Sequence, residues 1–141
     1  MPWLPICLTS SAWMAAVGWY VQLVHYPSFL FVRPERFAEF HARHAATTGV
    51  VVVPAMLAQL VSAVVLCIEP PEGFPSWWPY LGLALAVIAW GGTFLQAVPW
   101  HNRLAANGWD EAAIRGLVAS NLPRTLAWTG HAAWALATLR R

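Results

Sequence analysis

The sequence contains few charged residues and no lysine. Only 10% of its 141 residues are charged, whereas soluble domains average about 25%. All eight basic residues are arginines. Together with a hydrophobic content of 59%, this balance excludes an ordinary soluble domain and predicts an integral membrane protein.

Several familiar kinds of chemistry are excluded by missing motifs. The two cysteines, Cys7 and Cys67, are too few and too far apart for a CxxC metal or redox site. No GxGxxG, Walker, HExxH or GxSxG sequence occurs. There is also no basic stripe with interleaved aromatic residues, so no nucleic-acid partner is expected. Function must be sought in polar residues that lie within or beside the apolar segments.

Four apolar segments approach the roughly 20 residues needed to cross a bilayer. They cover about residues 4–25, 47–68, 79–98 and 122–139, and the last is interrupted by Arg124, Thr129 and His131. We therefore predict one all-α domain over residues 1–141. Its fold would be an integral membrane four-helix bundle of two antiparallel hairpins with cytoplasmic helical extensions.

The distribution of charge predicts an orientation. Two of the predicted connections carry most of the arginines, and the opposite side carries acidic residues and the terminal arginine pair: Arg33, Arg36, Arg43, Arg103 and Arg115 against Glu69, Glu72, Arg140 and Arg141. Because positive loops stay in the cytoplasm, both arginine-rich connections are predicted to be cytoplasmic. Both termini would lie outside a bacterial inner membrane.

The sequence also indicates where helices begin and end. A proline pair, Pro27 and Pro34, breaks the chain after the first segment, and a helix restarting near Glu35 is expected to reach Ile68. Gly108 is expected to end an extension of the third segment. Asp110 is a good N-cap for the next helix.

The stretch 37–48, FAEFHARHAATT, places two histidines on an apolar face. On a helix, His41 and His44 share a face with Phe37, while the charged residues lie opposite. Glu39 with Arg43 is predicted to form a stabilising pair at i, i+4, as is Glu111 with Arg115. The histidines therefore point into the bundle rather than into water.

The two halves of the chain resemble each other weakly. Gln22 and Pro27 near the end of the first segment parallel Gln96 and Pro99 near the end of the third. This pattern is compatible with a duplicated helical hairpin, but matches at this level commonly arise by chance.

Four histidines approach the arginine-rich side from three predicted helices: His25, His41, His44 and His101. Neutral imidazole is a common ligand of zinc, copper and iron, and helical bundles hold metals or haem between facing helices. The sequence thus predicts a site for a transition metal (iron, copper or zinc) or haem. The alternative is that these rings bond backbone carbonyls freed by the nearby prolines.

A second group of residues is predicted to bind substrate beside these histidines: Gln96, Trp100, Asn121, Arg124 and Trp128. Arg124 with Asn121 would orient a polar end, and Trp128 or Trp100 would pack on a ring. Alternatively, Arg124 snorkels at the mouth of its span and Gln96 joins helices. His131, two turns from Arg124, is compatible with a haem ligand, a proton relay or a core histidine.

The combination of four spans, an HxxH (His41 to His44) before the second and an Asn-x-x-Arg (Asn121 to Arg124) before the fourth resembles small bacterial four-span membrane proteins of uncharacterised function. More loosely, it resembles the anthrone-oxygenase-like membrane proteins. That resemblance implies an oxidoreductase acting on lipophilic molecules. It covers the architecture and transfers no functional residue.

The leading functional hypothesis is an integral membrane oxidoreductase with a histidine-ligated metal or haem at its cytoplasmic rim. Its substrate would be a lipophilic small molecule that enters from the bilayer. One alternative is a non-catalytic subunit that packs against other membrane subunits or a second copy. Another is a small transporter or proton-coupled channel that uses His25 and His131.

Overall fold

The structure, a computed structural model, describes residues 2–140, which form helices joined by turns and loops, with no strand in that range. Four long helical arms are built from six α-helices and three short irregular segments. The α-helices are α1 (Trp3–Tyr20), α2 (Tyr26–Ser28), α3 (Pro34–Ile68), α4 (Trp78–Gly92), α5 (Val98–Asn107) and α6 (Glu111–Leu139). The irregular segments are two π-helices, Val21–His25 and Thr93–Ala97, and a 3₁₀ turn, Phe29–Phe31. The all-helical class predicted from the sequence is confirmed.

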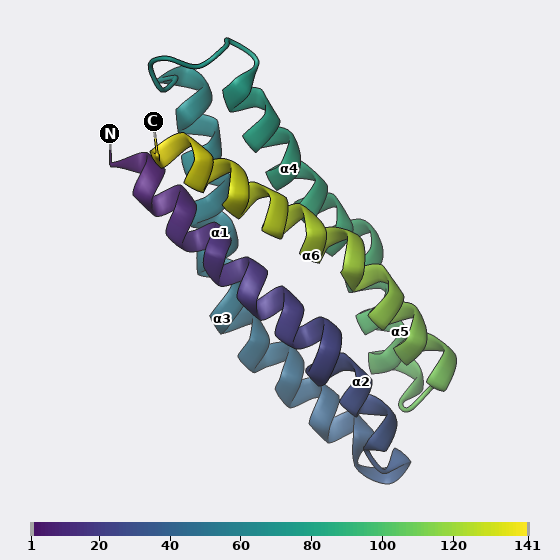
Figure 1. Cartoon of the computed structure of the whole chain (residues 1–141). Coiled ribbons are helices and arrows are strands. Elements are labelled where there is room, and N and C mark those ends of the chain that lie inside the picture. The colour runs from purple at the N-terminus through teal and green to yellow at the C-terminus, as the bar shows by residue number, and fades with distance from the viewer. Residues whose placement is uncertain (1, 141) are drawn as a thin grey trace.

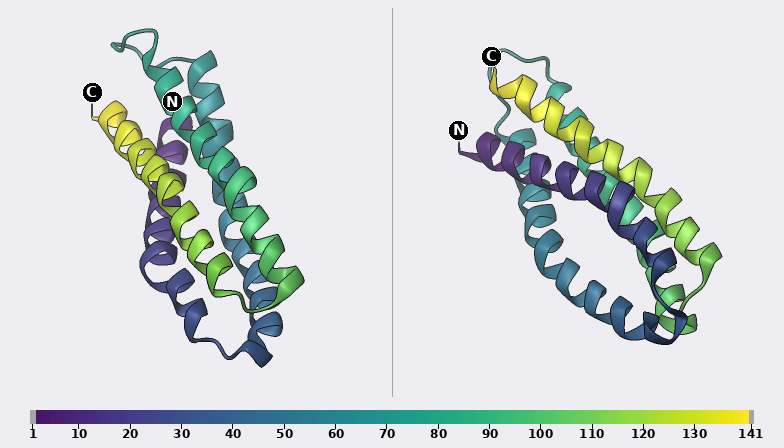
Figure 2. Two further views of the ribbon diagram at one scale, coloured as in Figure 1. Left: turned by 90° about the vertical axis from the view of Figure 1, so that its right-hand side faces the viewer. Right: turned by 60° about the horizontal axis from the view of Figure 1, so that its bottom comes forward.

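The four arms form an elongated antiparallel bundle (Figure 1). The first arm, α1 to α2, packs on α6 and α3, while α4 packs on α6 and α3. Both chain ends and the α3–α4 loop lie at one end of the bundle, and the α2–α3 and α5–α6 turns lie at the other (Figures 1 and 2). We call the latter the histidine end, because His25, His41, His44 and His101 lie there.

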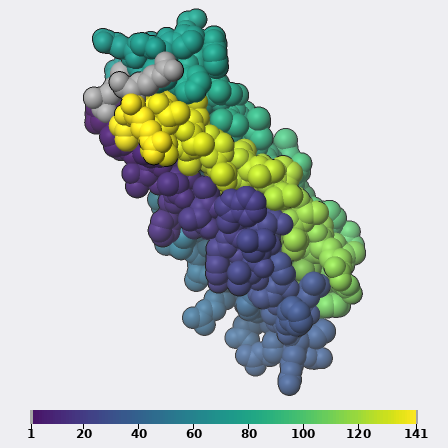
Figure 3. Space-filling view, in the orientation of Figure 1, coloured from purple at the N-terminus to yellow at the C-terminus, as the bar shows by residue number. Residues whose placement is uncertain are grey.

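Three helical arms are long and apolar enough to cross a membrane: Trp3–Phe31, Pro34–Ile68 and Trp78–Asn107. The segment 122–139 within α6, the fourth span expected from the sequence, does not join them. The reason is its composition, since polar side chains, among them Arg124, Thr129 and His131, lower its mean hydropathy. α6 runs along the face of the bundle shown in Figure 3, beside α1.

Helix α3 begins and ends where the sequence predicts. It starts at Pro34, whose missing N–H is no loss in the first turn, and it continues to Ile68. Phe37, His41 and His44 are buried, as their common face predicts. Pro54 lies inside the helix, which bows away from the other three arms over its middle (Figure 2). A proline removes one helical hydrogen bond and favours such a bend.

The two hairpins share an irregularity. In each, the first arm contains a five-residue π-helical segment that ends two residues before a proline: Val21–His25 before Pro27, and Thr93–Ala97 before Pro99. π-bulges of this kind are rare and often occur at functional sites. Both lie next to the histidine end, although aligning them pairs Gln22 with Phe94 and not with Gln96.

The turn from α5 to α6 follows the expected pattern. Gly108, with φ +75°, ends α5, and Asp110 caps α6 by accepting a hydrogen bond from the Ala113 backbone N–H at 3.0 Å. That bond, helped by Arg103 beside the carboxylate, holds the pKa of Asp110 below its ordinary value.

One of the two predicted ion pairs is wrong. Arg115 binds Glu111 at 2.8 Å, as expected. Glu39, however, pairs with Arg36 at 3.0 Å, one turn before it, rather than with Arg43. Both spacings, i, i+3 and i, i+4, bring side chains together on a helix, so spacing alone does not choose between two arginines on the same face.

Candidate functional site

The structure brings the four predicted histidines together in two hydrogen-bonded pairs. Nε2 of His25 lies 2.8 Å from Nδ1 of His44, and Nε2 of His41 lies 3.0 Å from Nδ1 of His101. The rings of His44 and His101 also stack, with centroids 5.4 Å apart. Side chains from the π segment after α1, from α3 and from α5 thus form one cluster.

Aromatic rings hold this cluster in place. Phe29 is fully buried and sets the edge of its ring against His44 at 5.1 Å and His25 at 5.3 Å. Phe37 stacks on His41 at 5.8 Å. Because these contacts fix the ring orientations, the imidazoles are positioned by packing as well as by hydrogen bonds.

A chain of hydrogen bonds leads from Arg124 into the cluster. The Arg124 guanidinium only donates, so it donates to the Tyr26 oxygen at 3.0 Å. The Tyr26 oxygen also lies 3.0 Å from Nε2 of His101, and its own O–H is free to donate there. We expect this direction, in which a neutral His101 carries its proton on Nδ1 and donates it to His41.

This chain leaves His101 and His41 poorly suited to bind a metal as they stand. An imidazole binds a metal through a nitrogen lone pair, and here both ring nitrogens of His101 and Nε2 of His41 already make hydrogen bonds to other side chains. Within residues 2–140, no group of three or more His, Cys, Asp or Glu side chains is arranged so that it can hold a metal ion. The predicted metal or haem site stays a prediction.

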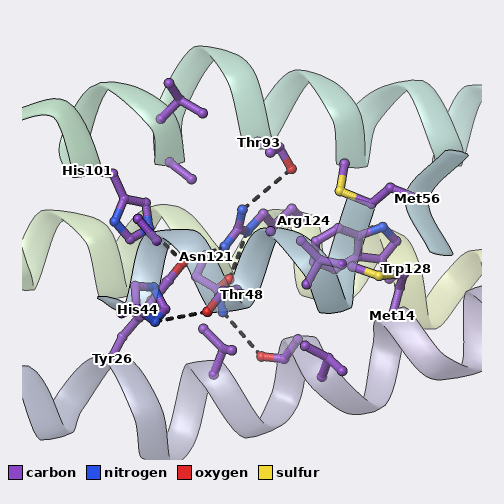
Figure 4. Close-up of a pocket in the computed structure, with 18 of the residues that line it drawn as sticks. Met14, Tyr26, His44, Thr48, Met56, Thr93, His101, Asn121, Arg124 and Trp128 are labelled. Carbon is purple, nitrogen blue, oxygen red and sulfur yellow. Dashed lines mark hydrogen bonds between the residues drawn. The ribbon is translucent and has the colours of Figure 1, made fainter. Parts of the chain in front are cut away.

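A pocket of about 280 Å³ opens beside the cluster, between α3 and the α4–α5 arm, with α1 and α6 behind it. Its wall changes character along the bundle (Figure 4). Near the histidine end it presents Tyr26, His44 and His101, and Arg124 and Asn121 lie in the middle. Towards the centre of the bundle it is lined by apolar and indole side chains: Met14, Val52, Met56 and Trp128.

Arg124 is the charged residue of this pocket. Its side chain is buried, with the residue only 8% exposed. It donates to Asn121 Oδ1 at 2.8 Å, to Tyr26 at 3.0 Å and, more weakly, to Thr93 Oγ1 at 3.4 Å. A guanidinium has five N–H groups, so two remain without an acceptor in the described part of the chain. No carboxylate in that part pairs with it.

Trp128 lies one turn further along α6 and faces the same pocket. The guanidinium of Arg124 lies over its ring, 5.4 Å from the centroid. The Trp128 indole N–H is buried and has no hydrogen-bond partner in residues 2–140. The buried indole N–H groups of Trp90 and Trp109 lack a partner in this range as well.

The other predicted substrate residues divide between this pocket and the surface. Asn121, Arg124 and Trp128 line the pocket. Gln96 is exposed on the π segment, and Trp100 packs instead against α6, beside Gly116. Both residues lie at the same height along the bundle as the pocket, as their positions near the end of the third predicted span indicate. Their side chains, however, point away from the pocket.

Sequence reasoning missed Tyr26, which joins Arg124 to the histidines. Tyr26 is buried, with only 3% of the residue exposed. A tyrosine directly after His25 and before a proline is the available signal, but it does not stand out, because tyrosine is common at span ends for reasons unrelated to a site.

His131 lies outside this pocket in a separate polar cluster. Its Nδ1 is 2.6 Å from Ser11 Oγ and 3.1 Å from Gln59 Nε2. These partners come from α1 and α3, so His131 joins three helices inside the core. His25 belongs to the histidine cluster instead, and the two residues named for the transporter hypothesis thus lie in different clusters.

The chain matches no protein-family model, and no curated protein or solved structure is significantly similar to it. The resemblance to the anthrone-oxygenase-like membrane proteins therefore rests on the sequence pattern alone. Any function must be argued from the site.

Proposed function

We propose that this is an integral membrane protein with four spans that binds a lipophilic small molecule in the pocket between α3 and the α4–α5 arm. The polar end of the molecule would meet Arg124 and Asn121, and its apolar part would lie against Met14, Met56 and Trp128. The arginine-rich histidine end would face the cytoplasm, by the positive-inside rule. Three membrane-length apolar arms support the membrane placement.

The observation that carries this proposal is the position of Arg124. Ionisable side chains at membrane depth are costly and usually face a cavity or a partner. Arg124 is buried, lines the pocket and has N–H groups left over. A pocket that combines such a group with an apolar wall is typical of small-molecule sites, which are mostly apolar with a few placed polar groups.

Filling the pocket tests the proposal. Gly49 lines it, and a Cβ atom added there meets no atom within 4 Å. We expect Gly49→Phe to reduce the binding of a lipophilic probe, 1-naphthoate, by about tenfold or more, because the new ring occupies the cavity. Binding is measured by equilibrium dialysis against the protein in phosphatidylcholine nanodiscs, with empty nanodiscs subtracted.

Gly91→Phe is the matched control. Gly91 is also helical and also has open space around it, but it does not line the pocket. It should bind the probe like the unmodified protein. Equal binding by both variants would show that the probe does not occupy this cavity.

The metal- or haem-dependent oxidoreductase predicted from the sequence is a second proposal. The contact of four imidazoles from three helical segments favours it. Two nitrogens bound to one tetrahedral metal at about 2.0–2.1 Å are roughly 3.3 Å apart. The two nitrogen atoms of each pair, now 2.8 and 3.0 Å apart, would have to move apart only slightly to bind one metal. The hydrogen bonds from Tyr26 to His101 and from His101 to His41 would have to break to free the nitrogen atoms.

Metal analysis and the absorption spectrum of protein purified without chelator test this second proposal. We expect a stoichiometric transition metal or a Soret band that is lost in His44→Ala. His131→Ala is the control, because His131 belongs to the other cluster. A colourless, metal-free protein that also takes up no added Zn²⁺ or Fe²⁺ would refute it.

A further inference from the structure

We infer that the ligand of this pocket is an anion. It would be a lipophilic molecule with an oxyacid group, such as a carboxylate, whose negative charge pairs with the guanidinium of Arg124. This inference rests on the proposed function, because it names the chemical class that the same pocket accepts. The rest of the pocket sets the orientation of the molecule.

Arg124 carries a full positive charge in a mostly apolar setting. Its direct contacts, Asn121, Tyr26, Thr93 and the Trp128 ring, are all uncharged. Hydrogen bonds to neutral groups and a cation–π contact reduce the cost of burying a guanidinium but leave its charge uncompensated. Buried charges in proteins are usually paired, so a partner is expected.

The acidic residues of the described chain do not provide that partner. Three of them bind surface arginines: Glu39 with Arg36, Asp110 with Arg103, and Glu111 with Arg115. The others, Glu35, Glu69 and Glu72, form no ion pair with Arg124. Two unused guanidinium N–H groups match the two oxygens of a carboxylate, which arginine often binds in a bidentate manner.

The ring of Trp128 gives a second contact surface. Trp128 lines the pocket, and its ring lies under the Arg124 guanidinium. In Figure 4 the Trp128 ring lies on the Met56 side of Arg124, towards the apolar end of the cavity. The geometry suits a compact ligand with its acid group at Arg124 and a ring or short chain beside Trp128.

The volume of about 280 Å³ favours a small acid over a two-chain phospholipid, although a lipid headgroup offers the same anionic oxygens. The experiment compares 1-naphthoate with 1-naphthamide, which has the same shape and no charge. Both are dialysed at pH 7.5 against the protein in phosphatidylcholine nanodiscs. A second set of nanodiscs contains phosphatidylglycerol as the competing anionic headgroup.

We expect naphthoate to bind about tenfold or more tightly than naphthamide, as charge-assisted bonds are stronger than neutral ones. In Arg124→Gln this preference should fall to about onefold while naphthamide binding is kept. Arg124→Lys should retain a preference, because the charge remains. Arg115→Gln, which removes an exposed arginine paired with Glu111, should behave like the unmodified protein.

Equal binding of the two probes to the unmodified protein would overturn the inference without touching the proposed pocket, and this comparison does not depend on any variant folding. If neither probe binds, the proposed function itself fails, and the inference fails with it. Competition by phosphatidylglycerol would support an anion site whose natural ligand is a lipid headgroup. Binding of naphthoate that is unchanged by this lipid supports a free lipophilic acid.

Discussion

Replacing Phe29 by alanine is expected to lower the free energy of unfolding by about 3–5 kcal/mol, the usual range for removing a large buried ring. Phe29 is 0% exposed and lies between the π segment Val21–His25 and α3, with ring-edge contacts to His25, His44 and Phe40. The cavity left behind would also free the imidazoles to rotate. Denaturant unfolding in mild detergent, followed by near-ultraviolet circular dichroism, measures the change.

Phe31→Ala is the control for this change. Phe31 lies in the same 3₁₀ turn but is 88% exposed, so its truncation should alter stability by no more than about 0.5 kcal/mol. Similar effects of the two substitutions would mean that Phe29 is not the packed centre of the histidine cluster.

Tyr26→Phe is expected to cost about 1–3 kcal/mol and to change the tautomer of His101. The substitution removes one hydroxyl, which now accepts from Arg124 and donates to His101, each at 3.0 Å. Both partners would then lack a bond in a buried site, and that loss costs more than the bond itself contributes. In the unmodified protein, nitrogen NMR of the labelled imidazole should find the His101 proton on Nδ1. In the variant this constraint is lost.

Tyr20→Phe provides the comparison. Tyr20 ends α1, is 57% exposed and stacks its ring on His25 with centroids 6.0 Å apart, and its hydroxyl has no hydrogen-bond partner in the described chain. Both stability and the His101 signals should stay as they are. A His101 proton found on Nε2 in the unmodified protein would contradict the direction of the hydrogen-bond chain.

Local features were predictable because they depend on neighbouring residues. The start of α3 near Pro34, the end of α5 at Gly108 and the Asp110 cap each follow from the conformational preferences of one or two residues. The predicted pair of Glu39 with Arg43 was wrong because the choice between Arg36 and Arg43 does not depend on sequence spacing alone. Two arginines at allowed spacings are equivalent until the rotamers are known.

The sequence predicted how far along the bundle the site lies, but not which side chains meet there. Counting helical turns correctly placed His41, His44, Asn121 and Arg124 near one end, facing inwards. It also placed Gln96 there, although the π-helical segment turns this residue to the surface. An inserted π turn changes which residues share a face, and hydrophobic periodicity does not reveal it.

By itself the sequence determined the all-helical class, the apolar arms and the inward faces of the histidines, because composition and helical periodicity act over a few residues. Only the tertiary structure decided which groups touch. Tyr26, distant in sequence from both His101 and Arg124, bonds both, and a cavity lies next to a buried arginine that pairs with no carboxylate of residues 2–140. These contacts depend on how four helices pack, which a one-dimensional pattern does not specify.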